Sequence, residues 1–205
     1  SRAAYNSSQW FADQGFVVVI VDNTGTPGKG SEWERGVLND LAQPVLDDQV
    51  EILRDLNDLE PRADTSRVGI RGWSFGGYLA ALAVLRRPDL FHTAIAGAPV
   101  TEWRLYDTHY TERYLGNPAT DPTTYERSSV VPYLEQLCRP LLLVHGMADD
   151  NVLFENSTRV YKALQDEGKL FQMIDYPGSK HSMRGEKVRN HLYKSLAAFL
   201  DSQLK

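Results

Sequence analysis

The stretch RVGIRGWSFGGYLAALAV, residues 67–84, sets a single serine among glycines, between two apolar segments. Glycine weakens the interior of strands and helices, so a cluster of glycines indicates a tight turn that a Cβ would obstruct. Residues 72–76, GWSFG, match the pattern G-x-S-x-G of a nucleophile elbow, in which a sharp strand-to-helix turn strains the serine and exposes its hydroxyl above the sheet. The stretch therefore predicts a strand, a turn carrying a nucleophilic Ser74, and a helix. We expect Gly72 and Gly76 to flank the serine because a Cβ would collide there.

Apolar and helix-like runs alternate along the rest of the chain. Five apolar runs bounded by turn residues are predicted to be buried parallel strands, at residues 16–21, 67–72, 93–98, 140–145 and 169–176. Apolar residues at helical spacing predict the intervening helices, at residues 46–59, 78–87, 160–166 and 188–199. The alternation predicts one α/β domain over residues 1–205, with a mostly parallel sheet flanked by helices. Residues 101–137 break the pattern and are predicted to form an insertion over the strand ends.

Charge and cysteine content exclude several classes of protein. The 205 residues carry a net charge of −5 with acidic and basic side chains interleaved, so no basic stripe is available for nucleic acid. The longest apolar run, residues 16–21, is far shorter than the roughly 20 residues that span a bilayer, so no membrane segment is expected in this chain. Cys138 is the only cysteine, which excludes an internal disulfide and a thiolate metal cage. A lone cysteine favours a reducing compartment, so we expect a cytoplasmic protein, with a periplasmic or extracellular location as the alternative.

A nucleophilic serine needs a histidine base oriented by a carboxylate, and in elbow-containing hydrolases these follow in the order Ser, Asp or Glu, His. That order excludes His92 and His109, which precede any plausible later acid, and His145, which ends a predicted strand just before the acidic cluster. His181 and His191 are left as candidate bases. His191 falls within the last predicted helix, whereas His181 lies in a loop after the last strand, where catalytic residues of open α/β sheets gather. Asp149 and Asp150 both follow the strand at 140–145 and are equally good candidates for the acid. A glycine-rich turn with no catalytic role is the alternative explanation of the motif.

Two further features adjoin the serine. The backbone amide of Phe75, at the start of the predicted helix, is the expected donor to the oxyanion that forms on an attacked carbonyl. Tyr106 and Tyr110 lie four positions apart and would share a helix face if their segment is helical, with Trp103 one turn earlier. These rings could form an aromatic wall beside the serine, on which a flat proline ring would stack. Ordinary core packing is the alternative explanation of the same aromatic residues.

Four segments, GWSFGGY, APVTEWRLYDTHYTERYLG, HGMADDNV and KHS, resemble the catalytic domain of the dipeptidyl peptidase IV branch of the prolyl oligopeptidase (S9) serine peptidases. The resemblance covers essentially the whole chain and implies an α/β-hydrolase fold. It selects Asp149 as the acid of a triad with Ser74 and His181, and it implies no metal and no cofactor. It also implies that Asn151 holds the polar amine or carbonyl end of the substrate. The implied proline pocket consists of Phe75, Val100, Trp103, Tyr106, Tyr110 and Val152.

The same resemblance implies a function. A member of this branch releases Xaa-Pro, or less readily Xaa-Ala, dipeptides from the N-terminus of a peptide through an acyl-enzyme. A prolyl oligopeptidase, an acylaminoacyl peptidase or an esterase would use the same triad on other substrates. A binding protein that keeps the hydrolase fold without the chemistry is a further alternative, since fold alone does not imply function.

Parts that the family uses are not in this chain. The resemblance places the second oxyanion donor, a tyrosine, and the glutamates that grip the substrate amine upstream of Ser1, the latter in a β-propeller. It also places a missing N-terminal strand between residues 16–21 and the nucleophile strand, so we expect a hole in the sheet. We therefore expect these residues to be the C-terminal part of a larger polypeptide, which can form a homodimer through this domain.

Overall fold

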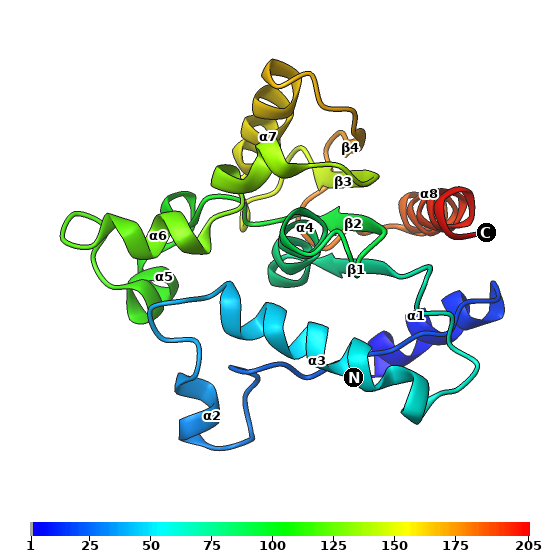
Figure 1. Ribbon diagram of the computed structural model, residues 1–205. Coiled ribbons are helices and arrows are strands. Elements are labelled where there is room, and N and C mark those ends of the chain that lie inside the picture. Colours follow the sequence, from blue (N-terminus) through cyan, green and yellow to red (C-terminus); the bar gives the residue numbers. More distant parts are fainter. Residues whose placement is uncertain (1) are drawn as a thin grey trace.

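The computed structural model describes residues 2–205, and its centre is a parallel sheet of four strands (Figure 1). The strands follow one another in the order β1-β2-β3-β4, with all three pairings parallel. Their bounds are β1 (Gly69–Trp73), β2 (Thr93–Gly97), β3 (Leu141–Gly146) and β4 (Gln172–Tyr176). The sheet confirms the predicted α/β architecture and four of the five predicted strands, each shifted or shortened by a few residues.

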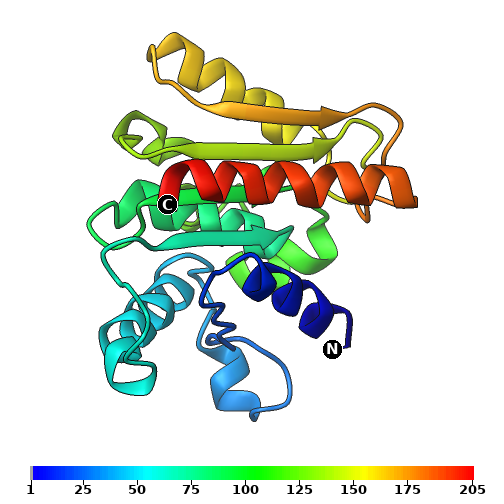
Figure 2. The same ribbon diagram turned by 90° about the vertical axis from the view of Figure 1, so that its right-hand side faces the viewer.

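Helices cover both faces of this sheet because alternate side chains of each strand point to opposite sides. Ala94, Ala96 and Leu143 pack on one side, against α3 (Gln43–Leu59), α4 (Phe75–Arg86) and α7 (Glu155–Asp166). Ile95 and Val144 pack on the other, against α8 (Glu186–Leu204) and Phe11 of α1 (Arg2–Asp13). Figure 2 shows α8 lying along the strands and running opposite to them. None of the described helices is long and apolar enough to cross a membrane.

The predicted insertion folds into short helices that lie to one side of the sheet (Figure 1). These are η1 (Trp103–Leu105), α5 (Thr108–Leu115), α6 (Pro122–Ser128) and η2 (Val131–Gln136). The carboxylates of Asp107 and Asp121 cap α5 and α6 by accepting hydrogen bonds from the backbone amides of Tyr110 and Thr124. Trp103 ties the insertion together because its indole N–H donates to the carbonyl of Ser128 at 2.9 Å.

The prediction of a strand over residues 16–21 is wrong for this structure. The segment follows α1 in an extended course without a ladder, and Val17, Val19 and Ile20 are 52%, 45% and 65% exposed. A short helix α2 (Ser31–Arg35) follows. The reason is the lack of a partner, since a strand needs a neighbour to satisfy its backbone groups. Among residues 2–205 no strand pairs with this segment.

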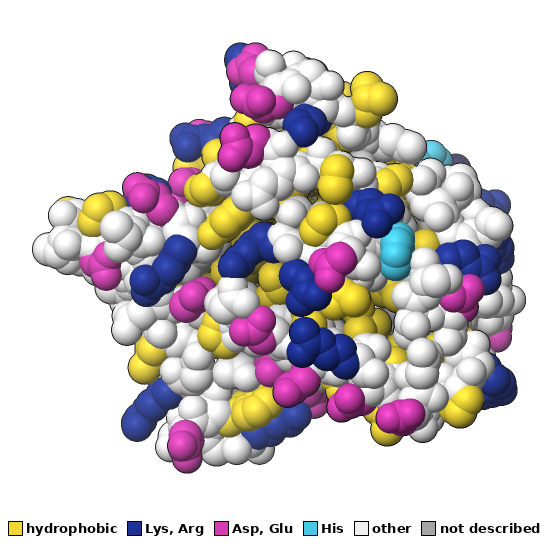
Figure 3. Space-filling model, in the orientation of Figure 1, with side chains coloured by type: hydrophobic (Ala, Val, Ile, Leu, Met, Phe, Trp, Pro, Cys, Tyr) yellow, Lys and Arg dark blue, Asp and Glu magenta, His cyan; other side chains and the backbone are white. Residues whose placement is uncertain are grey.

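A cavity separates residues 16–21 from the sheet, at the place of the hole that the family resemblance implies. β1 is an edge strand that pairs only with β2, and its free edge and residues 16–21 line the same space of about 580 Å³. Leu53 and Leu56 of α3 and Leu204 of α8 also line it. In Figure 3 apolar side chains are visible in a hollow where Figure 1 shows the gap between β1 and α3.

Candidate active site

Ser74 occupies a strained turn between β1 and α4. Its backbone has φ 61° and ψ −118°, an unusual conformation for a residue with a side chain. Such strain costs on the order of 1–3 kcal/mol and persists only where the surroundings enforce it. Here the Ser74 amide donates to the carbonyl of Gly97 on β2 at 2.8 Å, and its carbonyl accepts from the amide of Tyr78 at 2.9 Å. The neighbouring strand and the first turn of α4 therefore hold the serine in the geometry of a nucleophile elbow.

Close packing explains Gly72 and Gly77 in this turn, whereas the sequence predicted collisions at Gly72 and Gly76. A Cβ on Gly72 would lie 2.1 Å from the carbonyl oxygen of Gly76, as expected. A Cβ on Gly76 would meet nothing within 4 Å, because this residue faces the cavity beside β1. The second close approach is at Gly77, where a Cβ would lie 2.3 Å from the carbonyl oxygen of Gly97. The expected collision is therefore correct at Gly72 and wrong at Gly76.

The structure distinguishes the two candidate acids. Asp149 has a fully buried side chain, and its Oδ2 lies 2.7 Å from Nδ1 of His181. Asp150 is exposed and pairs with Nζ of Lys180 at 2.5 Å, a contact that lowers the pKa of the Asp150 carboxyl. The other candidate base, His191, lies on α8 away from both aspartates, with its Nδ1 hydrogen-bonded to a tyrosine hydroxyl. The structure thus brings together one aspartate and one histidine of the predicted pairs.

Asp149 is fixed at both carboxylate oxygens. Its Oδ1 accepts from the backbone amides of Asn151 at 2.9 Å and Val152 at 3.0 Å, in the loop that follows β3. Its Oδ2 lies 2.7 Å from His181 and 3.2 Å from Nε2 of His145. Four donors around a buried carboxylate leave it little freedom to rotate, so the oxygen that faces His181 is held in place.

The histidine loop is tied to the serine turn through the residue before the serine. The indole Nε1 of Trp73 donates to the backbone carbonyl of His181 at 2.8 Å. Gly97 leaves room for this indole, because a Cβ there would lie 2.1 Å from the ring. Within residues 2–205 the structure gives the Ser74 hydroxyl no hydrogen bond to His181, whose side chain is 20% exposed. Catalytic hydrogen bonds of this kind are often long in a free enzyme and tighten when substrate binds.

The amide of Phe75 is the first of α4 and, like other N-terminal amides, has no acceptor within its own helix. It lies directly after the serine, at the end of the helix whose dipole favours negative charge. An oxyanion formed on a carbonyl attacked by Ser74 would meet this donor. Among the residues that the structure describes, no cluster of three or more histidine, cysteine or acidic side chains is arranged to hold a metal.

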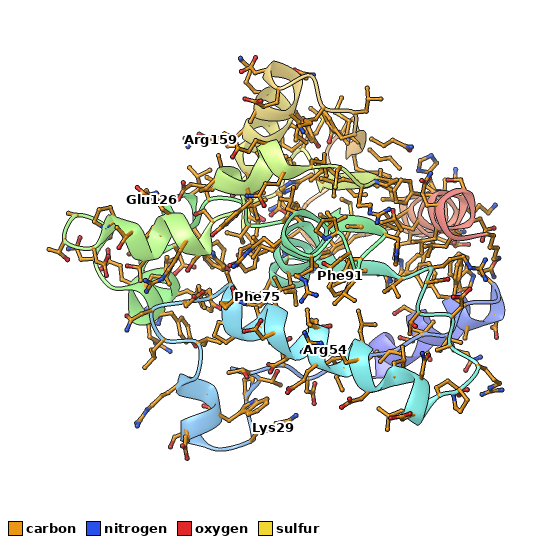
Figure 4. The ribbon with its side chains drawn as sticks, in the orientation of Figure 1. Lys29, Arg54, Phe75, Phe91, Glu126 and Arg159 are labelled. Atoms are coloured by element: carbon orange, nitrogen blue, oxygen red, sulfur yellow. The ribbon has the colours of Figure 1, made fainter. Side chains whose placement is uncertain are left out.

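Aromatic rings pack beside the serine turn, as predicted, but not along one helix. The Trp103 ring stacks on Tyr110 with centroids 5.9 Å apart, and Tyr106 meets Tyr110 edge-on at 5.5 Å. Tyr106 precedes α5 in an extended conformation, so the condition for a shared helix face is not met, and the two rings meet through the bend between η1 and α5. The ring centroids of Phe75 and Trp103 are 6.1 Å apart, and Figure 4 shows Phe75 between α4 and the insertion helices. Burial raises the pKa of Tyr110 to about 12, so its hydroxyl stays protonated.

The remaining predicted substrate-binding residues lie next to these rings or behind them. Val100 and Val152 are almost completely buried and belong to the same apolar cluster as Trp103. Asn151 is exposed, and its Oδ1 accepts a hydrogen bond from the Tyr106 hydroxyl at 3.1 Å. With its oxygen occupied in this way, the Asn151 side chain has its amide N–H groups left to donate to a ligand.

One residue that sequence reasoning discarded lies at the centre of the site. His145 was excluded as a base because it precedes the acid, yet the structure buries it completely at the end of β3, in contact with Asp149. A signal was present in the sequence, since a histidine that ends a buried strand four residues before the acid cannot reach water and needs partners in the same loop.

Comparisons with known proteins agree on one family. The model of the prolyl oligopeptidase family, Peptidase_S9, matches residues 3–205. Human dipeptidyl peptidase 8 is 41% identical over 200 residues, which are 94% of this chain and 22% of that protein. Bovine dipeptidyl peptidase 4 is 33% identical over 190 residues, 91% of this chain and 25% of that protein. The crystal structure of Porphyromonas gingivalis dipeptidyl peptidase 4 superposes with a TM-score of 0.85 at 38% identity, over 90% of this chain and 26% of that one.

Proposed function

The chain belongs to the prolyl oligopeptidase family, in its dipeptidyl peptidase IV branch, and on this premise we propose that Ser74, His181 and Asp149 are its catalytic triad. The contact that carries the proposal is the 2.7 Å pair between the buried Asp149 and His181, in a loop bonded to the serine turn. Ser74 attacks a peptide carbonyl while His181 takes its proton, and the amide of Phe75 donates to the oxyanion. His181 returns the proton to the leaving amine, and water then hydrolyses the acyl-enzyme.

The proposed substrate is a peptide with proline, or less readily alanine, before the cleaved bond. The aromatic group of Trp103, Tyr106 and Tyr110 supports this, because a proline ring is flat and apolar and stacks well on such surfaces. A pocket of this kind gains only about 1–3 kcal/mol per methylene, so alanine is accepted with a lower kcat/KM. The free amide N–H of Asn151 is a donor, so it suits a carbonyl of the substrate. It does not suit the substrate's ammonium group, which is a donor as well.

The activity belongs to a longer polypeptide. The chain spans about a quarter of the length of its relatives, at 22% and 25% of two dipeptidyl peptidases. We propose that the remainder supplies the second oxyanion donor and the amine-binding site, the latter in a β-propeller. The cavity between residues 16–21 and β1 supports the further proposal that an extended segment of the same polypeptide pairs with the free edge of β1.

The test uses the full-length protein and two chromogenic substrates that differ only at the N-terminus. An exopeptidase cleaves Gly-Pro-p-nitroanilide and leaves an N-blocked peptidyl-Pro analogue intact, because only the first offers a free amine. Cleavage of the blocked substrate would favour an oligopeptidase or acylaminoacyl peptidase. Cleavage of simple esters alone would favour an esterase. No turnover of any of these by purified, folded protein would favour a binding protein and overturn the proposal.

A further inference from the structure

His145 is a completely buried histidine that the proposed reaction does not use. It is the penultimate residue of β3 and lies against Phe154, whose ring meets the imidazole edge-on at a centroid distance of 5.5 Å. Both ring nitrogens have partners within the protein. Nδ1 lies 2.7 Å from the hydroxyl of Ser157 on α7, and Nε2 lies 3.2 Å from Oδ2 of Asp149 and 2.9 Å from the carbonyl oxygen of Val152.

These partners determine which nitrogen carries a hydrogen. A carboxylate oxygen and a peptide carbonyl can only accept, so Nε2 between them must be the donor. The Ser157 hydroxyl can donate to Nδ1, which leaves no need for a second proton on the ring. Burial lowers the pKa of His145, with the Val152 carbonyl and Asp149 acting in the opposite direction. The groups therefore fit one state, a neutral imidazole with its hydrogen on Nε2.

We propose that His145 is a positioning residue, whose Nε2–H holds Asp149 in the orientation in which its Oδ2 faces His181. The proposal rests on the proposed triad. Oδ2 has two in-plane lone pairs, so it can accept from both histidines, which lie 3.2 Å and 2.7 Å from it. Oδ1 is taken by the two backbone amides described above. His145 thus completes the shell of donors around a carboxylate that water does not reach.

Ser157 and α7 extend this arrangement away from the reacting atoms. Ser157 is completely buried and fixes the ring of His145 from the Nδ1 side. Other titratable groups near His145 come from neighbouring elements. Asp175 of β4 is its partner in the parallel ladder, and Tyr161 of α7 donates its hydroxyl to Asp175 at 2.7 Å. His181 faces the same carboxylate oxygen. Of these groups, Asp149 is the one that accepts from the imidazole.

Removing the Nε2–H leaves one lone pair of Oδ2 without a donor in a dry site. The carboxylate can then rotate, and a small misplacement of a catalytic group costs up to about 10²-fold in rate. The less solvated carboxylate also directs more of its charge at His181 and favours the protonated imidazole. Loss of His145 should therefore lower kcat and move the acid limb of the kcat/KM profile to higher pH.

Two substitutions in the full-length enzyme separate this role from packing. In His145→Gln the side-chain amide N–H can occupy the position of Nε2 and still reach Asp149. In His145→Asn it reaches only the position of Nδ1. We expect His145→Asn to lower kcat on Gly-Pro-p-nitroanilide by about 10- to 100-fold, with KM within about twofold and the acid limb displaced. We expect His145→Gln to keep most of the activity and the wild-type pH profile. Ser157→Ala, which removes only the donor to Nδ1, should have an intermediate effect.

The control is wild-type turnover. If the wild type does not cleave the substrate, the proposed function fails. If the wild type cleaves the substrate, two results would refute the positioning role alone. One is a wild-type kcat in His145→Asn, and the other is an equal loss of activity in His145→Asn and His145→Gln with unchanged Tm and pH profile. Should His145→Asn not fold, the ¹⁵N chemical shifts of labelled histidine in the wild type decide. A neutral His145 with its hydrogen on Nε2, constant over the pH range in which activity rises, supports the proposal. A hydrogen on Nδ1, or titration within that range, overturns it.

Discussion

Strand β3 and the segment of residues 16–21 carry similar apolar side chains, LLLVHG in the first and FVVVIV in the second. β3 pairs on both sides, with β2 and β4, and all six of its residues are buried. In the part of the chain that the structure describes, no strand pairs with residues 16–21, and Val17, Val18 and Val19 are exposed. An apolar run therefore indicates a segment that gains free energy by burial, but the neighbouring strand decides whether it becomes part of a sheet.

The contrast extends to function. Asp149 follows β3, and its partners are His145 within that strand, two backbone amides of the loop that follows it, and His181 in the loop after β4. The paired part of the sheet thus holds the proposed acid and base in defined positions. The free edge of β1 faces a cavity instead, and Gly76, two residues after the serine, opens into that cavity. Ser74 is consequently hydrogen-bonded to β2 on one side, whereas its other side borders the cavity.

The largest expected effect lies on the paired side. Asp149→Asn in the full-length enzyme should lower kcat by about 10⁴-fold, because the neutral amide neither fixes the tautomer of His181 nor stabilises its charge. Steady-state kinetics on Gly-Pro-p-nitroanilide measures this. The matched control is Asp150→Asn, which removes an exposed carboxylate paired with Lys180 and should change kcat less than twofold. Equal losses in the two variants would contradict the assignment of the acid.

Leu143→Ala tests the packing of β3 itself. Leu143 is fully buried, and its side chain belongs to the apolar cluster that contains the residues of α4. Truncating a buried leucine removes apolar contacts and leaves a cavity, which costs about 2–5 kcal/mol. A lower Tm of the catalytic domain in differential scanning calorimetry would show this cost. An unchanged Tm would mean that the strand is not part of the core.

Ile20→Ala probes the open side in the same way. Ile20 is 65% exposed and lines the cavity beside β1. A residue this exposed normally tolerates truncation within about 0.5 kcal/mol. If a strand from the rest of the polypeptide fills the cavity, the same change in the full-length protein should cost more than about 1 kcal/mol and lower Tm accordingly. A neutral result would indicate that the cavity stays open in the longer protein.

A smaller effect on kcat is expected at Trp73, which joins the serine turn to the histidine loop. Trp73→Phe keeps an aromatic ring above Gly97 and removes the hydrogen bond to the carbonyl of His181. One such bond contributes about 0.5–1.5 kcal/mol, so kcat should fall by about 2- to 10-fold with little change in KM. Stopped-flow or steady-state kinetics would detect it. A wild-type kcat would show that the indole does not hold the histidine loop.

Local chemistry made the geometry of the candidate site partly predictable. The strained turn at Ser74 follows from glycine spacing, because few other sequences can make that turn. The sequence alone does not show whether Asp149 or Asp150 is the acid. The two aspartates are neighbours, and only the fold of the loop decides which carboxylate faces His181. The resemblance selected Asp149, and in the structure Asp149 is the buried aspartate beside His181.

The errors share a physical origin in contacts that a sequence does not display. Residues 16–21 form no strand because none of the described residues pairs with them. Tyr106 and Tyr110 meet through a bend rather than along a helix. His145 was discarded by an argument about the order of residues, whereas its importance comes from being buried against the acid. In each case long-range packing, rather than local propensity, determined the outcome.

Labelling of the full-length protein with a fluorophosphonate tests the central claim most directly. The account predicts one covalent adduct per chain on Ser74, found by peptide mass spectrometry, with no adduct in Ser74→Ala and strongly slowed labelling in Asp149→Asn. An adduct on a different residue, or hydrolytic activity that survives in Ser74→Ala, would contradict it.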